Sequence, residues 1–243
     1  MPAFRLATTS ARDAARLFRP TLQRLWLPLL TLHVAELAFS QALAFLQEKA
    51  MARAENLLFI VVLIAWQLLF TAIWSAAYLV IVGRTMLDIA DQRPDRGWFF
   101  HLTECFSQTL IETVRAWASV LRWAVVLILP GIFEFTRLYW APFFAALDPE
   151  YDRGSIDALA GSRLLVKSRW WLTFSLAAIW IALPDGAGLI FESGDDRLLS
   201  NPIGVLTAVT ASAALNLFCF GWAVAIFRKL RGNLRSESAI LSV

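Results

Sequence analysis

The sequence is poor in charge and in catalytic motifs. Only 17% of its 243 residues are charged and 58% are hydrophobic, whereas a soluble domain has about 25% charged and about 45–50% apolar residues. The chain contains no P-loop, no GxGxxG after a strand, no HExxH and no GxSxG. Because no acid, base and nucleophile can be assembled from motifs, we predict that the protein is not an enzyme.

Cysteine and histidine are also scarce, with two residues of each. The cysteines form neither a CxxC motif nor a disulfide framework. The histidines stand in two HxxE pairs, His33 with Glu36 and His101 with Glu104, and this spacing places each pair on one helix face. Neither pair has a third ligand nearby in the sequence. We therefore expect polar contacts between helices at these positions, and neither a metal nor another cofactor.

The apolar residues are gathered into long runs. A hydrocarbon core of about 30 Å requires about 20 apolar residues in a helix. Five apolar runs cover residues 25–46, 57–82, 116–147, 170–184 and 203–227. The run 116–147 exceeds this length, and the run 170–184 reaches it only if it begins earlier, within 163–169. These runs predict an all-α fold, a polytopic transmembrane bundle of about six membrane helices with interfacial amphipathic helices.

The distribution of Lys and Arg predicts the topology. Five Arg precede Trp26, three basic residues lie in 84–96, four in 148–169 and four after Phe227, whereas 47–56 has two and 192–201 has one. Basic loops stay in the cytoplasm. Both termini, 84–115 and 148–169 are therefore predicted to be cytoplasmic, with 47–56 and 192–201 outside. This pattern explains the net charge of +3 without nucleic-acid binding, for which no motif exists.

The predicted topology requires the run 116–147 to enter and leave on one side. Pro130 and Gly131 lie near its middle, where proline removes a helix hydrogen bond and glycine adds backbone freedom. We predict a helical hairpin with arms 116–129 and 132–147 and with Pro130 and Gly131 as its hinge. Each arm is ~21–24 Å long, which is short for a crossing. The hairpin is therefore either two short spans or a re-entrant element. A single kinked span is the alternative, and it would place the basic tail outside.

The segments outside the runs divide the chain into three parts. Residues 1–24 are a basic N-terminal segment, 25–230 a single transmembrane domain, and 231–243 a short tail. For residues 1–24 an interfacial helix on an anionic leaflet is favoured, and a disordered basic arm or a transit peptide are the alternatives. Residues 98–115 and 155–168 have amphipathic patterns and are expected to lie along the cytoplasmic interface.

Charged residues inside the hairpin are the candidate site, because a charge at the centre of a membrane helix costs about 2.5–3.5 kcal/mol. Glu134 and Arg137 stand three residues apart in the returning arm, and Arg122 lies in the outgoing arm. The favoured interpretation is an internal ion pair that holds the hairpin against its neighbours. The functional alternative is a site for an anionic headgroup or solute.

The last run has small residues at every fourth position. They are Gly204, Ala208 and Ser212, followed by Asn216. Small side chains let helices approach closely, and asparagine can hydrogen-bond across the interface. An internal packing face is favoured, and a seam with a second copy or with another membrane protein is the alternative.

One part of the chain resembles a known group of proteins. The residues that carry the resemblance are LPGIFEFTRLYWAPFFAALDPE (129–150) and IDALAGSRLLVKSRWWLTFSLA (156–177). They are similar to bacterial multi-pass inner-membrane proteins, including the YciC-like proteins and the membrane domain attached to some glycerophosphoryl diester phosphodiesterases. The resemblance implies a membrane bundle in a bacterial inner membrane, and it implies no reaction.

These features predict a non-enzymatic membrane protein that acts in envelope homeostasis, or as a partner or scaffold of another membrane component, in contact with membrane lipids. The alternative is a transporter or a lipid-handling protein for an anionic lipid or solute, with 116–147 as its site. A third hypothesis, an enzyme acting on lipid headgroups, needs a catalytic set that the sequence does not show. A scaffold should keep Glu134 and Arg137 paired and sealed, whereas a transporter should have a polar cavity that reaches Arg137.

Overall fold

The structure is a computed structural model that describes residues 3–52, 57–167, 169–179 and 202–241. These ranges contain helices and no strand, so the all-α fold class is confirmed. The helices are α1 (Ala3–Ala52), α2 (Leu57–Ala90), α3 (Trp98–Val126), α4 (Ile128–Leu138), α5 (Ala141–Leu147), α6 (Pro149–Asp152), α7 (Ala158–Val166), an apolar helix over Trp170–Ile179, and α10 (Pro202–Leu241).

Three of these helices are long and apolar enough to cross a membrane. The qualifying segments are Arg5–Ala50, Leu58–Ala90 and Thr210–Leu234, and they overlap the predicted runs 25–46, 57–82 and 203–227. The run predicted at 170–184 begins as the helix Trp170–Ile179. Its last residues, and the connection at 192–201, lie outside the described residues.

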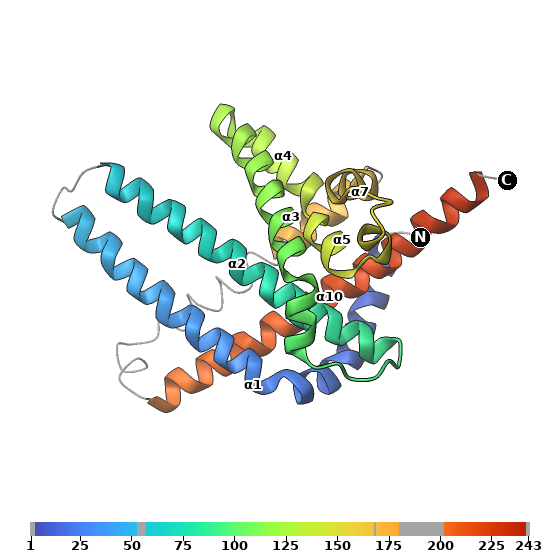
Figure 1. Cartoon of the computed structure of the whole chain (residues 1–243), viewed down its shortest axis with the longest axis horizontal. Coiled ribbons are helices and arrows are strands. Elements are labelled where there is room, and N and C mark those ends of the chain that lie inside the picture. Colours follow the sequence, from blue (N-terminus) through green and yellow to red (C-terminus); the bar gives the residue numbers. More distant parts are fainter. Residues whose placement is uncertain (1–2, 53–56, 168, 180–201, 242–243) are drawn as a thin grey trace.

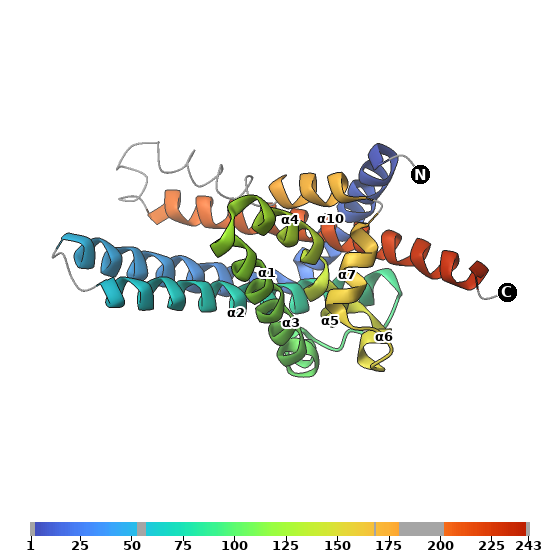
Figure 2. The same cartoon turned by 90° about the horizontal axis from the view of Figure 1, so that it is seen from above.

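The three long helices form the frame of the molecule. α1 and α2 lie side by side, and α10 packs along α1 (Figures 1 and 2). Both described chain ends lie at the end of the molecule away from Ala52 and Leu57 (Figure 1). α1 changes direction in its N-terminal half, where Pro20 and Pro28 lie inside the helix and each removes a backbone hydrogen bond.

The N-terminal residues belong to α1 and dock on α10. No helix boundary separates residues 3–24 from the rest of α1. The indole Nε1 of Trp222 donates to the carbonyl oxygen of Ala7 at 3.0 Å, and Leu6 and Ala14 are buried. Leu6 and Ala14 are therefore covered by the protein itself, and Leu17 and Phe18 are half-buried. At the other end, α10 continues to Leu241, so most of the predicted tail extends the last helix.

α3 and α4 form an antiparallel pair that projects from the body (Figure 1). The chain reverses at Leu127, whose backbone is extended with φ −157° and ψ 137°. Pro130 lies in the first turn of α4, where a missing N–H breaks no helical hydrogen bond. Gly131 allows close packing instead of bending, because a Cβ there would lie 2.9 Å from Cα of Ala124. The turn residue is thus Leu127 and not the predicted hinge.

The arms of this hairpin differ from their predicted boundaries. α3 runs unbroken through residue 116, so the amphipathic segment and the outgoing arm are one helix. The returning arm is split between α4 and α5. The hydroxyl of Ser162 stabilises this break, since it donates to the carbonyl oxygen of Arg137 at 2.7 Å and accepts the Trp140 N–H at 3.2 Å.

α5 lies in the centre of the hydrophobic core. Its residues are buried with the exception of Pro142, and it packs against α2, α3 and α7. The rings of Trp140, Phe143 and Phe144 surround Phe227 of α10, with centroid distances of 5.1–6.0 Å. The end of the predicted returning arm is therefore enclosed by other helices, and its neighbours carry the polar clusters described next.

Candidate functional site

Glu134 is the centre of the polar cluster inside the hairpin. Its side chain is 6% exposed, and its Oε1 lies 2.5 Å from Nη2 of Arg163 on α7. Arg137 approaches Oε2 at 3.5 Å, and Ser119 of α3 donates to Oε1 at 3.4 Å. The carboxylate thus ties three helices together. The predicted pair of Glu134 and Arg137 exists, but the contact of Glu134 with Arg163 is shorter. The sequence did not predict this contact, although Arg163 lies in the stretch 156–177 that carries the family resemblance.

The two predicted arginines have different surroundings. The Arg137 side chain is 42% exposed, and its guanidinium lies 5.5 Å from the ring centroid of Phe133. Arg122 is exposed on α3, and no ion pair joins it to another described residue. The structure therefore brings Glu134 and Arg137 together and leaves Arg122 apart, so the three residues do not form one anion site.

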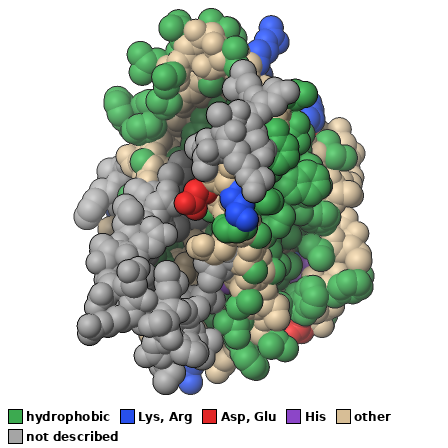
Figure 3. All heavy atoms as spheres, turned by 90° about the vertical axis from the view of Figure 1, so that its left-hand side faces the viewer, with side chains coloured by type: hydrophobic (Ala, Val, Ile, Leu, Met, Phe, Trp, Pro, Cys, Tyr) green, Lys and Arg blue, Asp and Glu red, His purple; other side chains and the backbone are tan. Residues whose placement is uncertain are grey.

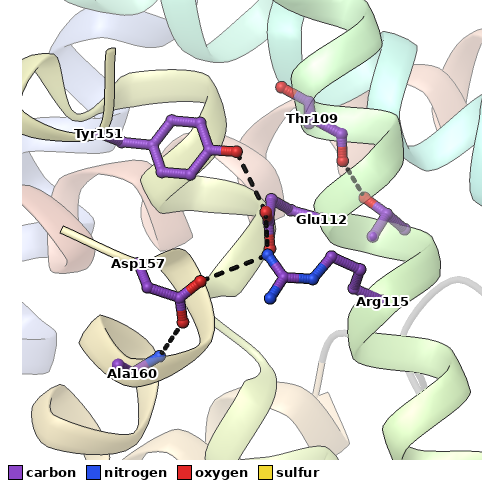
Figure 4. Close-up of polar contacts among 7 residues, drawn as sticks. Thr109, Glu112, Arg115, Tyr151, Asp157 and Ala160 are labelled. Atoms are coloured by element: carbon purple, nitrogen blue, oxygen red, sulfur yellow. Dashed lines mark hydrogen bonds and ion pairs between the residues drawn. The ribbon is translucent and has the colours of Figure 1, made fainter. Parts of the chain in front are cut away.

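A second cluster joins α3 to α6 and α7 (Figure 4). Glu112 is buried, and its Oε1 accepts from the hydroxyl of Tyr151 at 3.1 Å and from Nη1 of Arg115 at 2.5 Å. Arg115 also reaches Oδ1 of Asp157 at 3.3 Å. The other oxygen of Asp157 accepts the N–H of Ala160 at 3.0 Å and so caps α7. Glu112, an acidic residue of the amphipathic segment 98–115, is therefore a buried junction between helices.

Burial raises the pKa of Tyr151 to about 12, and the charge of Glu112 adds to the shift. An unfolded tyrosine has a pKa of about 10. The contact of the Tyr151 hydroxyl with Glu112 therefore stabilises the folded protein below pH 10, and this stabilisation is lost as the pH rises from about 10 to about 12. We expect Glu112→Gln to lower the pKa of Tyr151 towards 10, measured by ultraviolet difference absorbance of tyrosinate. Tyr151→Phe identifies the signal, and an unchanged titration in Glu112→Gln would contradict the contact.

A third cluster locks α10 to the junction of α5 and α6. The guanidinium of Arg231 contacts the carboxylates of Asp148 and Glu150 and lies 5.4 Å from the ring centroid of Phe144. Arg231 is 6% exposed and Asp148 is 2% exposed. Asp148 also accepts the N–H of Glu150 at 2.9 Å, as the N-cap of α6. The first residue of the predicted tail, Arg231, is thus part of the core.

Further ion pairs lie at the same end of the molecule, which we call the charged end and define by the following contacts. Ion pairs join Arg24 to Asp95 at 3.5 Å, Arg84 to Asp152 at 3.5 Å, Arg228 to Asp91 at 2.7 Å and Lys229 to Asp13 at 2.6 Å, and the imidazole of His101 lies 2.9 Å from the carboxylate of Asp88. Most of them connect different helices, so charge at this end is used mainly to hold the bundle together.

The two HxxE pairs serve other contacts. His101 pairs with Asp88 of α2 at 2.9 Å while Glu104 is exposed. Burial lowers the pKa of His101, and Asp88 opposes this effect. His33 is buried, with Nδ1 3.0 Å from the carbonyl oxygen of Leu29 and Nε2 3.2 Å from Nδ2 of Asn216. No group of three or more metal-ligating residues occurs in the part of the chain that the structure describes.

The predicted packing face of α10 ends at Asn216. The contact of Asn216 with His33 shows that α10 packs against α1 at this residue. Ser212 is half-buried one turn earlier. Gly204 and Ala208 lie on the same helix, but their side chains are outside the described part of the structure. The suggested contact of this face with a second copy stays a prediction.

An apolar cavity of about 470 Å³ lies between α2, the α3–α4 hairpin, α5 and α10. Its wall includes Leu79, Trp117, Phe135, Tyr139, Phe143 and Phe220. The hydroxyls of Thr71 and Thr113, also in the wall, donate to carbonyl oxygens of their own helices at 2.9 and 2.7 Å. Neither Arg137 nor Glu134 lines it. The cavity is therefore suited to an apolar chain and not to an anion.

Comparison of the chain with protein-family models, with curated proteins and with solved structures found no match. The resemblance to the YciC-like and phosphodiesterase-linked membrane proteins stays a prediction. The polar clusters and the apolar cavity are therefore the features that indicate its function.

Proposed function

We propose that the protein is a non-enzymatic membrane scaffold that acts with other components of a bacterial inner membrane. The observation that carries the proposal is the sealing of Glu134, whose carboxylate is almost fully buried and contacts Arg163 and Arg137. Glu112 and Asp148 are used in the same way, as junctions between helices. A catalytic or transport site would instead present such groups to a polar cavity.

The positive-inside rule supports a cytoplasmic location for the charged end. With this orientation α1, α2, the run that begins at Trp170, and α10 cross the bilayer. α4 has 11 residues, which is ~16 Å of helix and about half of the hydrocarbon thickness. We therefore assign the α3–α4 hairpin as a re-entrant element that enters from the cytoplasmic side. This arrangement has four crossings, in place of the six membrane helices expected from the sequence.

The surface of the hairpin supports its insertion. Val125 is 86% exposed, Ile128 75% and Leu129 79%, and such an apolar tip would be unfavourable in water. Hydrophobic side chains also cover much of the described surface that faces the viewer in Figure 3. Lipid or an apolar helix of another membrane protein would cover these side chains.

An exchange of charges tests the role of Glu134. In the single variants Glu134→Arg and Arg163→Glu, two like charges would face each other, and we expect a lower melting temperature in detergent. The double variant restores an attractive pair between α4 and α7, so it should recover most of the loss. A double variant no more stable than the single ones would contradict a structural pair. The matched control is Arg122→Glu, which should change the melting temperature little because this side chain is exposed.

The apolar cavity favours lipid handling as a second candidate function. Its volume of about 470 Å³ corresponds to about fifteen water-sized groups at roughly 30 Å³ each, which is comparable to one acyl chain. Native mass spectrometry of the protein in gentle detergent tests this function. Ala116→Phe, which would fill the cavity, should reduce the retained lipid, and Arg137→Ala should not, since Arg137 lies outside the wall. Equal retention by Ala116→Phe and the unmodified protein would contradict lipid binding in this cavity.

A further inference from the structure

A second cavity of about 460 Å³ lies between α1, α2 and α10 at the charged end. Its three basic side chains are Arg16 of α1 and Arg228 and Lys229 of α10, and its one acid is Asp13. No function described above uses this cavity. It lies on another part of the bundle from the apolar cavity, with no lining residue in common.

The balance of charge in this cavity leaves one cation without a partner. Lys229 contacts Asp13 at 2.6 Å, and Arg228 contacts Asp91 at 2.7 Å. Arg16 is exposed and forms no ion pair with any other described residue. The two carboxylates hold the α10 cations in position, while the guanidinium of Arg16 remains available. The site thus has a net positive charge and partly exposed donors, as binding of an anion requires.

The floor of the cavity is apolar. It is formed by Leu17, Met86, Ala90, Val224 and Ala225, of which Met86 and Val224 are almost fully buried. α2 and α10 are in close contact beside it, because a Cβ on Gly221 would lie 2.5 Å from Cε of Met86. A ligand that fits this site has an anionic group for the basic rim and an apolar part for the floor.

The position of the cavity along the helices indicates where such a ligand would come from. Met86 and Ala90 come just after the uncharged run 57–82 of α2, and Arg228 and Lys229 come just after the uncharged run 203–227 of α10. The cavity therefore lies at the level where lipid headgroups meet the bilayer core. Basic pockets between membrane helices on the cytoplasmic side bind anionic headgroups.

We propose that this cavity binds the phosphate of an anionic phospholipid, with Arg16 as the principal ligand and Arg228 and Lys229 as supporting cations. A guanidinium can donate two parallel hydrogen bonds to a phosphate, which gives it more orientation than an ammonium. Leu17 and Ala225 would contact the glycerol and the first methylenes of the lipid. The site rests on the assignment of the charged end to the membrane surface and is independent of the apolar cavity.

The test uses the full chain in a non-ionic detergent, titrated with short-chain phosphatidylglycerol, short-chain phosphatidylcholine or glycerol phosphate. Native mass spectrometry counts bound lipid, and the melting temperature follows binding. We expect phosphatidylglycerol to bind and to raise the melting temperature more than phosphatidylcholine. Arg16→Gln should weaken its binding about tenfold, and Arg16→Lys should recover part of the loss. Arg19→Gln, an exposed arginine one turn away that does not line the cavity, should leave binding unchanged.

Arg16 is exposed, so its replacement should leave the fold intact, and an unaltered melting temperature without lipid confirms this. Three outcomes would overturn the proposal. Equal weakening by Arg16→Gln and Arg19→Gln would show attraction to the general basic surface only. Equal binding of the two lipids would show that the net negative charge of the headgroup is not recognised. Equal stabilisation by glycerol phosphate would identify a soluble anion as the ligand. None of these outcomes bears on the sealing of Glu134, so the scaffold proposal is tested separately.

Discussion

Replacement of Arg231 by alanine is expected to lower the free energy of unfolding by about 3–5 kcal/mol, because it removes the guanidinium from a buried ion pair and leaves a buried carboxylate with less compensation for its charge. The guanidinium contacts Asp148 and Glu150, and Asp148 is only 2% exposed. The same side chain packs on the ring of Phe144 in the core. Equilibrium unfolding in mixed micelles, followed by tryptophan fluorescence, measures the change.

The matched control for Arg231→Ala is Arg153→Ala. Arg153 is exposed after α6 and forms no ion pair with another described residue, so its removal should change the free energy by no more than about 0.5 kcal/mol. If Arg231→Ala were as mild as the control, α10 would not be locked to the α5–α6 junction. The charged end would then be a set of surface pairs, which contribute about 0–1 kcal/mol each.

Gly131→Ala is expected to destabilise the protein by about 1–3 kcal/mol, although the same change inside a helix is usually favourable. The added Cβ would lie 2.8 Å from Cβ and 2.9 Å from Cα of Ala124. Backbone atoms cannot move aside as the end of a flexible side chain can, so α3 and α4 would have to separate. The same unfolding measurement gives the free energy, and the distance between spin labels on Leu121 and Phe133 reports the separation.

Gly232→Ala provides a control of opposite sign. Gly232 lies within α10, and nothing lies within 4 Å of a Cβ placed there. Alanine should therefore stabilise this helix by up to about 1 kcal/mol, through helix propensity alone. If both substitutions stabilised the protein, Gly131 would be needed neither for close packing nor for the hairpin.

The sequence predicted the elements whose signal is local. A run of 57–82 without charge is sufficient for a long apolar helix, and α2 contains it. The i,i+3 spacing likewise predicted the contact of Glu134 with Arg137, since residues three apart share a helix face. Length, periodicity and short spacing are properties that one segment carries by itself.

The features that the sequence did not predict depend on distant residues. Arg163 reaches Glu134 from 29 positions away, and Arg231 reaches Asp148 from 83 positions away. Pro130 and Gly131 suggested a bend by composition, but the structure uses Gly131 for contact with Ala124 and reverses at Leu127. Hydropathy also cannot distinguish a helix facing lipid from one enclosed by protein, and for this reason the sequence did not predict the burial of α5 in the core.

Labelling of a cysteine at Leu127 tests the central claim, a scaffold whose α3–α4 hairpin enters and leaves the bilayer on the cytoplasmic side. The two native cysteines are buried and can be replaced first. Intact cells expressing Leu127→Cys are treated with a membrane-impermeant maleimide, with Glu48→Cys as the outside control and Ser155→Cys as the inside control. We predict labelling of Glu48→Cys in intact cells, of Ser155→Cys only after permeabilisation, and of Leu127→Cys in neither case. Labelling of Leu127→Cys from outside would show that the hairpin crosses the membrane and would contradict the account.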